Sequence, residues 1–372
     1  MPLSSVVGAQ SIVKPGVCTS STRPASPFDG QVIYMTDVDQ TAVWDGTQWT
    51  VLAPIAGNRN VIINGGMHVW QRGTSFTDCA FGLTVDRWEA GRGAFATGLT
   101  VSRQAGPNNF IYSARVQRVS GNISTQNIRF ATTLETINSI PLAGKTVTLS
   151  FYARCGANFS TANTQIEVYL RSGTASDAAR IGAGDTFGTG AATPLSLTQP
   201  LTTSWQRFSV TGTIGATANQ LALIVYASPT GTAGTNDWYE ISGVQLEHGA
   251  VATPFEFEDY GTTLTKCQRY YQVGAQFTAY TGSSTACTVW GHLLSEMRVS
   301  PTASVTGPLN VQGDGVNNTA QSSGSVGAFN FCSPVSVYLT AVGNFTGLTT
   351  GRTITISVPA NNGNYFTFSS EL

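Results

Sequence analysis

Four tryptophans in the middle of the chain have the most specific chemistry to offer: Trp70, Trp88, Trp205 and Trp238. An indole ring packs well against the apolar C–H face of a sugar, but a tryptophan within a strand pattern more often fills a core. Trp70 and Trp88 lie in strand-like sequence, so we expect them in the core. Trp205 and Trp238 stand beside loop-like sequence, which is equally consistent with either role. These two are the candidate glycan-binding residues.

No catalytic arrangement can be assigned from the sequence. The nucleophile motif GxSxG is absent. Glycosidic cleavage needs two carboxyl groups at a defined separation, and the acids that could supply them are Glu135, Glu167, Glu240, Glu247, Glu256, Glu258 and Asp259. Only residues 256–259 form a cluster, and their position after the last expected sandwich strand is typical of a solvated linker. We therefore expect a protein that is not an enzyme.

Metal and cofactor sites are not indicated either. The histidines His68, His248 and His292 are scattered, and none has a second ligand at metal-binding spacing. The six cysteines, which contain no CxxC motif, are Cys18, Cys79, Cys155, Cys267, Cys287 and Cys332. The N-terminus shows no basic region followed by an apolar stretch, which favours assembly in a reducing cytoplasm. We expect free thiols, no metal and no cofactor.

Charge and composition argue against two classes of partner. Charged residues make up 10% of the chain, with 19 basic and 20 acidic residues, so there is no electrostatic footprint for nucleic acid. The longest apolar run, 221–227, is far shorter than the roughly 18 residues of a membrane span, so we expect no membrane insertion. Abundant Thr, Ser, Asn and Gly suit pleated strands and turns. The predicted fold class is mostly β.

The elements that must position these residues are short strands separated by turn signals, the pattern of a β-sandwich. Segment 146–154 alternates cleanly and directs Val147, Leu149, Phe151 and Ala153 to one face, which we expect to be a core face. The strands expected in the middle region are 61–63, 67–71, 110–119, 146–154, 165–171, 206–212, 220–227 and 238–246.

Three regions follow one another along the chain. Residues 1–57 contain a proline-bearing arm, a strand at 31–36 and a hairpin in which Asp45-Gly46 predicts a type I′ turn, with Trp44 and Trp49 packing across it. Residues 58–258 form the sandwich. Residues 259–372 begin with a helix and continue as a smaller β domain, with strands near 286–294, 333–342 and 352–359.

The helix is expected over 262–272. Thr262 or Thr263 can serve as its N-cap, and Leu264, Cys267 and Tyr271 share one face. It joins the two larger β regions.

Several short motifs occur in a fixed order and carry a resemblance to a known group of proteins. They are Asn60-Val-Ile-Ile-Asn64-Gly-Gly-Met-His-Val-Trp70-Gln-Arg72-Gly73, Val85-Asp86-Arg87-Trp88, Ile241-Ser-Gly243-Val-Gln245-Leu-Glu247-His-Gly249 with Ala252-Thr-Pro254-Phe-Glu256, Cys267-Gln-Arg-Tyr-Tyr271, and Met297-Arg298 with Pro301-Thr302. In combination they resemble phage tail-fibre and receptor-binding proteins. The segment with Arg23-Pro24, Gly30-Gln31 and Trp44-Asp-Gly46 resembles virion attachment segments.

The resemblance implies an N-terminal attachment segment, a central jelly-roll domain similar to carbohydrate-binding modules, and a C-terminal β tip. It also implies a homotrimer, located in the virion tail, that joins other tail proteins and adheres to host-surface polysaccharide. Carbohydrate-binding modules commonly place an acidic pair in the final strand, whereas this chain has Glu240 alone there, so we assign no structural calcium.

Two other functions stay open at this stage. A short tailspike that hydrolyses surface glycan would need an acid pair in a groove, which the sequence does not show. A capsid decoration protein or a purely structural tail component would share the same fold.

Overall fold

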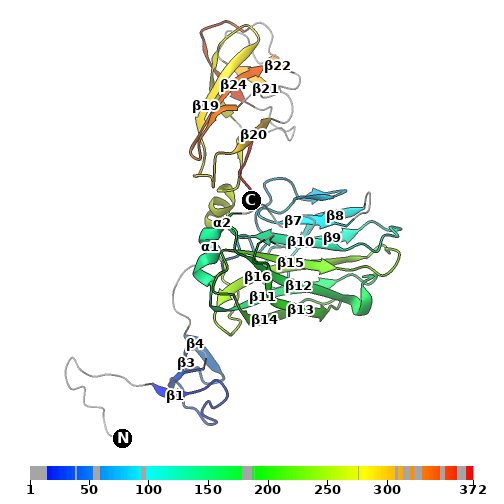
Figure 1. Cartoon of the computed structure of the whole chain (residues 1–372), viewed down its shortest axis with the longest axis vertical. Helices are drawn as coiled ribbons and strands as arrows, with labels where there is room; N and C mark the ends of the chain where they lie inside the picture. The colour runs from blue at the N-terminus through cyan, green and yellow to red at the C-terminus, as the bar shows by residue number, and fades with distance from the viewer. Residues whose placement is uncertain are drawn as a thin grey trace, which may run out of the picture.

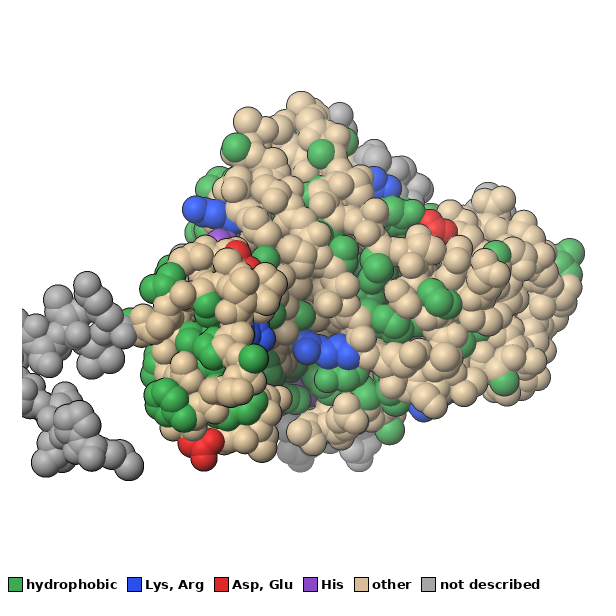
Figure 2. Space-filling view, turned by 90° about the horizontal axis from the view of Figure 1, so that it is seen from below, with side chains coloured by type: hydrophobic (Ala, Val, Ile, Leu, Met, Phe, Trp, Pro, Cys, Tyr) green, Lys and Arg blue, Asp and Glu red, His purple; other side chains and the backbone are tan. Residues whose placement is uncertain are grey.

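The computed structural model describes residues 15–37, 40–52, 59–93, 98–177, 187, 189–274, 276–305, 309–312, 319–321, 329–343, 348–357 and 366–371. This part of the chain is mostly β, as its composition predicts. Figure 1 shows the sandwich in the middle, with a second β domain beyond helix α2. Figure 2 shows one face on which charged side chains are sparse among uncharged ones.

The N-terminal unit is a four-stranded sheet in the order β1-β2-β3-β4. Its strands are β1 (Gly16–Cys18), β2 (Val32–Met35), β3 (Gln40–Trp44) and β4 (Trp49–Leu52). The expected hairpin is confirmed, with the rings of Trp44 and Trp49 5.6 Å apart. The predicted two-residue turn is wrong, because four residues separate the paired tryptophans. The Asp45 carboxylate accepts hydrogen bonds from the backbone N–H groups of Thr47 and Gln48, both at 2.8 Å, which stabilises the longer turn.

Two six-stranded antiparallel sheets face each other in the central domain. The first, which we name the site sheet, has the order β14-β11-β16-β9-β8-β5, and the second, the back sheet, has the order β13-β12-β15-β10-β7-β6. The strands are β5 (Ser75–Phe76), β6 (Phe81–Leu83), β7 (Glu89–Arg92), β8 (Leu99–Ala105), β9 (Tyr112–Arg118), β10 (Ile128–Thr133), β11 (Thr146–Cys155), β12 (Gln165–Gly173), β13 (Ala192–Pro200), β14 (Gln206–Thr213), β15 (Gln220–Ala227) and β16 (Trp238–His248). Helix α1 (Thr136–Ser139) and two 3₁₀ turns, Ile140–Leu142 and Ala162–Thr164, connect them.

The sandwich core lies between these sheets and contains the face that the alternation in 146–154 predicts: Val147, Leu149, Phe151 and Ala153 are all buried. Both tryptophans expected in the core are there. Trp88 is fully buried and stacks on Phe130, with ring centres 4.8 Å apart. The Trp70 indole N–H donates to the carbonyl of Met67 at 2.7 Å.

Two of the expected strands are wrong: residues 61–63 and 67–71 form turns and irregular chain. The Asn64 side chain replaces the sheet ladder there, since its Oδ1 accepts from the N–H groups of His68 and Val69 while its Nδ2 donates to the Val69 carbonyl. Asn64 and Met67 also have positive φ angles of 57° and 56°, which extended strands do not adopt. The sequence reading also missed β5, β6, β7, β8, β10 and β13.

The same segment packs tightly against β16. The Gly65 carbonyl accepts a hydrogen bond of 2.9 Å from Val244, next to Gly243, whose φ is +60°. A Cβ atom on Gly65 would lie 2.0 Å from the Val244 carbonyl oxygen. Only glycine allows this approach, so Gly65 fixes where the N-terminal segment of the sandwich meets β16.

The C-terminal domain has two sheets, in the orders β17-β26-β20 and β22-β21-β25-β18-β19-β24-β23. Its strands are β17 (Tyr271–Gly274), β18 (Gln276–Thr281), β19 (Ala286–His292), β20 (Thr302–Val305), β21 (Leu309–Gln312), β22 (Thr319–Gln321), β23 (Phe329–Cys332), β24 (Ser336–Gly343), β25 (Thr353–Ser357) and β26 (Phe366–Ser369). The strands predicted near 286–294, 333–342 and 352–359 are therefore present, as β19, β24 and β25.

Helix α2 (Tyr260–Gln268) precedes these strands and differs from its prediction at both ends. Asp259 is the N-cap, because its carboxylate accepts from the N–H of Thr262 at 2.9 Å. The helix ends before Tyr271, which begins β17. The buried residues of the helix are Thr263 and Cys267. Leu264, expected on the same buried face as Cys267, is only partly buried.

The joint between the sandwich and the C-terminal domain is built around Glu371. Its carboxylate contacts Arg87 and also pairs with Arg72 at 3.0 Å. The two guanidinium groups lie over tyrosine rings, Arg87 at 3.5 Å from the centre of Tyr270 and Arg72 at 3.6 Å from that of Tyr271. Both domains therefore contribute side chains to one buried ionic and aromatic cluster.

Two neighbouring contacts extend this joint. Arg269 donates to both oxygens of Glu135, at 3.0 and 3.1 Å, and links α2 to the loop before α1. The Gln71 amide donates to the Asp86 carboxylate at 2.7 Å and to the Tyr271 carbonyl at 2.9 Å. Burial raises the pKa of Asp86, although Arg72 lies close by.

Replacing Gly65 with alanine tests the close approach to β16. We expect Gly65→Ala to lower the free energy of unfolding by about 2 kcal/mol, the scale of overpacking a tight contact. Gly215→Ala is the matched control, since a Cβ there meets no atom within 4 Å. Chemical denaturation of both variants measures the difference. Equal stability of the two would contradict the assigned role of Gly65.

The thiols provide a second test. The five cysteines whose side chains are described are free, and burial raises the pKa of Cys155 and Cys267 and raises that of Cys287 to about 12. The reactive species is the thiolate, so we expect these three to resist alkylation in the folded protein near pH 8. When the chain is unfolded without reductant and then alkylated, intact-mass analysis should find six modified thiols. A mass two protons lower with blocked alkylation would instead indicate a disulfide.

Candidate functional site

A row of four side chains crosses the outer face of the site sheet. Arg154 on β11 pairs in register with Glu240 on β16, and Glu240 pairs with Arg115 on β9. Successive strand residues point to opposite faces, so these three lie opposite the core residues Ala153, Ile241 and Ala114. Trp205 immediately precedes β14, and the Arg154 guanidinium lies 4.9 Å from its ring centre. We name this set the arginine row.

Glu240 is the centre of the arginine row. Its side chain is 0% exposed, and it accepts hydrogen bonds of 2.8 Å from Nε of both Arg115 and Arg154. The two arginine side chains are 23% and 29% exposed, so they reach the surface while their carboxylate partner does not. Charge-assisted bonds of this length fix both guanidinium groups. The buried acid therefore orients two partly exposed cations.

Trp238 lies beside the row, two residues before Glu240. The guanidinium carbon of Arg115 is 4.1 Å from its ring centre and that of Arg154 is 5.6 Å away. Gly156 approaches the same indole, since a Cβ there would lie 2.7 Å from Cε2. The Trp238 side chain is half-buried, with both guanidinium groups beside its ring.

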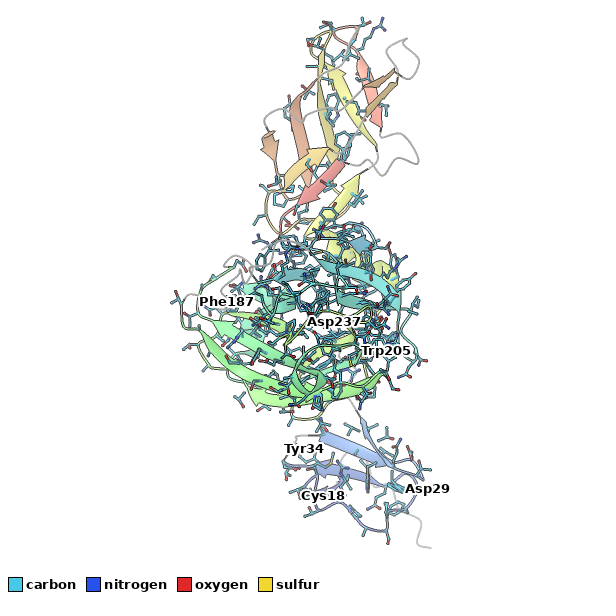
Figure 3. The ribbon with its side chains drawn as sticks, turned by 90° about the vertical axis from the view of Figure 1, so that its right-hand side faces the viewer. Cys18, Asp29, Tyr34, Phe187, Trp205 and Asp237 are labelled. Carbon is cyan, nitrogen blue, oxygen red and sulfur yellow. The ribbon has the colours of Figure 1, made fainter. Side chains whose placement is uncertain are left out.

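A buried ion pair positions the start of β16. Arg118, which is 0% exposed, donates to Asp237 at 2.8 Å, and Asp237 immediately precedes Trp238. Arg118 also donates to Ser160 at 2.8 Å and to the carbonyls of Asn122 and Ser124 at 2.8 and 2.6 Å. One guanidinium thus holds three loops at this end of the sandwich. Figure 3 labels Asp237 within the sandwich and Trp205 nearer its edge.

A strap formed by residues 250–257 covers the neighbouring part of the outer face. The Gln245 side chain accepts from the N–H of Glu256 at 2.8 Å, and Glu247 accepts from the N–H of Thr253 at 2.9 Å. These hydrogen bonds give Gln245 and Glu247, two residues of the sequence motif in β16, a structural role: they hold the strap against the sheet. The arginine row lies at the other end of the β11–β16 pairing, where Arg115 and Arg154 are partly exposed.

Arg207 on β14 adds a third cation at the edge of the strap. It is exposed and donates to the Ser150 hydroxyl at 3.2 Å and to the Thr253 carbonyl. Both acceptors are neutral. Within the described residues Arg207 forms no ion pair with a carboxylate.

The acids considered for glycosidic cleavage are dispersed among structural contacts. Glu135 pairs with Arg269, Glu258 with Lys266, and Asp259 caps α2. Glu167 accepts from the Tyr169 hydroxyl at 2.6 Å on the back sheet. The remaining three, Glu240, Glu247 and Glu256, hold the arginine row and the strap.

Metal-binding groups do not gather in the part of the chain that the structure describes. No set of three or more His, Cys, Asp or Glu residues there could hold an ion. His68 is half-buried with a pKa lowered by desolvation, while His248 and His292 are exposed. A cavity of about 470 Å³ lies between α1, α2 and residues 60–63, at the joint. Among the described helices none is long and apolar enough to cross a membrane.

Comparison with known proteins gives structural matches only. No family model matches the chain, and no curated protein matches it. Among solved structures, the chain is similar to the enzymatically active domain of tailspike protein 4 of bacteriophage CBA120, with a TM-score of 0.32 and 13% identity. That match covers 51% of this chain and 21% of the tailspike structure, so the chain spans about a fifth of its length.

Two carbohydrate-binding modules are also similar. TmCBM61, solved in complex with β-1,4-galactotriose, has a TM-score of 0.30 and 12% identity, covering 51% of this chain and 99% of the module. The CBM22-1 xylan-binding domain of Xyn10C from Paenibacillus barcinonensis has a TM-score of 0.27 and 13% identity, covering 48% and 94%.

The structure brings Trp205 and Trp238 to one surface, joined by Arg154. Sequence reasoning missed Arg115 and Arg154 and gave Glu240 no role beside them. One signal was present: the alternation in 146–154 that places Ala153 in the core places Arg154 on the outer face. The strand order that puts β9 and β11 on either side of β16 carries no local signal.

Proposed function

We propose that this chain is a structural protein of a bacteriophage tail, of the tail-fibre or receptor-binding kind, which adheres to host-surface glycan through the arginine row. The observation that carries the proposal is the meeting of Trp205, Trp238 and two fixed guanidinium groups on one open part of a rigid sheet. Aromatic rings contact the C–H faces of sugars, and arginine N–H groups donate to their oxygens. A site on strands keeps these groups in place without a ligand.

The ordered sequence motifs support the tail assignment independently of the site. Gly65, Arg72, Arg87 and Tyr270 belong to motifs that resemble phage tail proteins; the last three build the joint, and Gly65 makes the β16 contact. In this proposal residues 1–57 attach the chain to other tail proteins, 58–258 form the glycan-binding module and 259–372 form the tip. The protein is then a virion component assembled in the host cytoplasm.

The site is tested by removing the Trp205 ring, which lies at the edge of the sheet next to β14. We expect Trp205→Ala to lower binding to an array of bacterial surface polysaccharides about tenfold, with the melting temperature unchanged, since the side chain is only half-buried. Trp238→Ala should also weaken binding. Trp290→Ala is the matched control, because Trp290 is 39% exposed on β19, in the C-terminal domain.

Trp88→Ala separates a binding effect from an unfolding effect. Emptying this fully buried site should lower the free energy of unfolding by about 3–5 kcal/mol. If Trp205→Ala and Trp238→Ala fold and bind normally, the outer face is not the site, and a purely structural tail component becomes the better reading.

The assembly is proposed to be a homotrimer. The small N-terminal unit has a buried core that includes Ile33, Met35 and Ala42. It exposes Val17 and Leu52 on its sheet and Phe28 in the loop before β2, at 71%, 53% and 68%. Units this small generally need further stabilisation, and a partner subunit would cover these side chains. Three weak glycan sites would then add by effective concentration. Light scattering should give three times the chain mass of 39.1 kDa; a stable monomer at micromolar concentration would contradict this.

A further inference from the structure

We infer that the arginine row selects an acidic glycan, one whose sugar rings carry carboxylate groups; this rests on the proposed function. The local charge is the first reason. Arg207, Arg154 and Arg115 lie on the outer face of β14, β11 and β9, and Glu240 on β16 is the carboxylate that contacts Arg154 and Arg115. The arginine row carries a net charge of plus one, and Arg207 beside it brings the local sum to plus two, whereas the whole chain has a formal net charge of −1.

The second reason is that donors remain free after Glu240 is satisfied. A guanidinium group has five N–H donors. Arg154 uses Nε on Glu240, and within the described residues its terminal nitrogens donate no hydrogen bond. With the side chain 29% exposed, those terminal nitrogens face solvent. They form the planar fork that binds a carboxylate through two parallel bonds.

The third reason is that the cations are fixed before any ligand arrives. The Arg154 guanidinium lies over the rings of both Trp205 and Trp238, and Arg115 lies over Trp238. Glu240 holds both by Nε. Groups already held in position lose little conformational entropy on binding. Glu240, on the strand between them, also offsets the repulsion between the like charges of Arg115 on β9 and Arg154 on β11.

The experiment compares polysaccharides with and without their carboxylates. The full chain is tested on an array of acidic and neutral bacterial polysaccharides, and each polymer that binds is tested again after chemical reduction of its carboxyl groups to alcohols. We expect binding to acidic polymers, a loss of about tenfold or more on carboxyl reduction, and weakening by added salt. Arg154→Gln should produce the same loss on the unreduced polymer and a much smaller one on the reduced polymer.

Arg352→Gln is the matched control, since it removes the same charge from an exposed position in the C-terminal domain. Melting curves verify that Arg154→Gln stays folded. Equal binding before and after carboxyl reduction, with loss in Trp205→Ala, would overturn the acidic glycan and leave the proposed function standing. Binding confined to phosphate or sulfate polymers would also overturn it. Absence of glycan binding on the whole array would overturn the proposed function itself.

Discussion

The contact of Glu371 with Arg87 is the interaction that ties the two large domains together. Both side chains are almost fully buried, at 6% and 4% exposure. A buried guanidinium without its counter-charge is strongly unfavourable, so removal of one partner generally costs several kcal/mol. The Arg87 guanidinium also stacks on Tyr270 and donates through its second terminal nitrogen to the Thr133 carbonyl, while its buried Nε has no hydrogen-bond partner among the described residues. The orientation of the C-terminal domain on the sandwich thus depends on one buried cation whose two terminal nitrogens are bonded.

The sequence motifs that looked like a family signature are therefore architectural. Arg72 and Arg87 come from the first part of the sandwich, and Tyr270 and Tyr271 from the region after α2, yet they meet in one cluster. Gly65 holds the segment around residue 65 against β16, and Asn64 ties the same segment to the Asp86 carbonyl. The residues of these motifs are spaced along the chain so that they meet at the joint between the two domains. The side chains of the arginine row come from outside these motifs, so the residues that build the joint are separate from those of the proposed site.

Local pattern and long-range pairing explain which features the sequence could predict. Alternation in 146–154 identified a true core face, and strand context placed Trp70 and Trp88 correctly in the core. Segment 61–71 is apolar enough to resemble strands, but the Asn64 side chain takes over its hydrogen bonds, a tertiary effect that no local pattern reports. Strand β7, Glu-Ala-Gly-Arg, has little strand propensity and forms because β10 and β6 pair with it. The arginine row needs the register of β9, β16 and β11, which are far apart in the sequence.

Because charged residues make up only 10% of the chain, most of its surface is electrically neutral. Many of the acids serve internal pairs: Asp237 with Arg118, Glu89 with Arg129, Glu135 with Arg269 and Glu371 with Arg87. Buried pairs contribute little field outside the protein, since each cation is matched at contact distance. Threonine and serine hydroxyls, as in the Thr148–Thr211 pair across β11 and β14, cover much of the remaining outer face. Against such a neutral background, guanidinium groups that exceed their local carboxylates are felt over a full Debye length of about 8 Å at physiological salt. In the proposed glycan site, the position of Arg154 and Arg207 then decides which polymers approach this face at all, before any sugar ring meets Trp205.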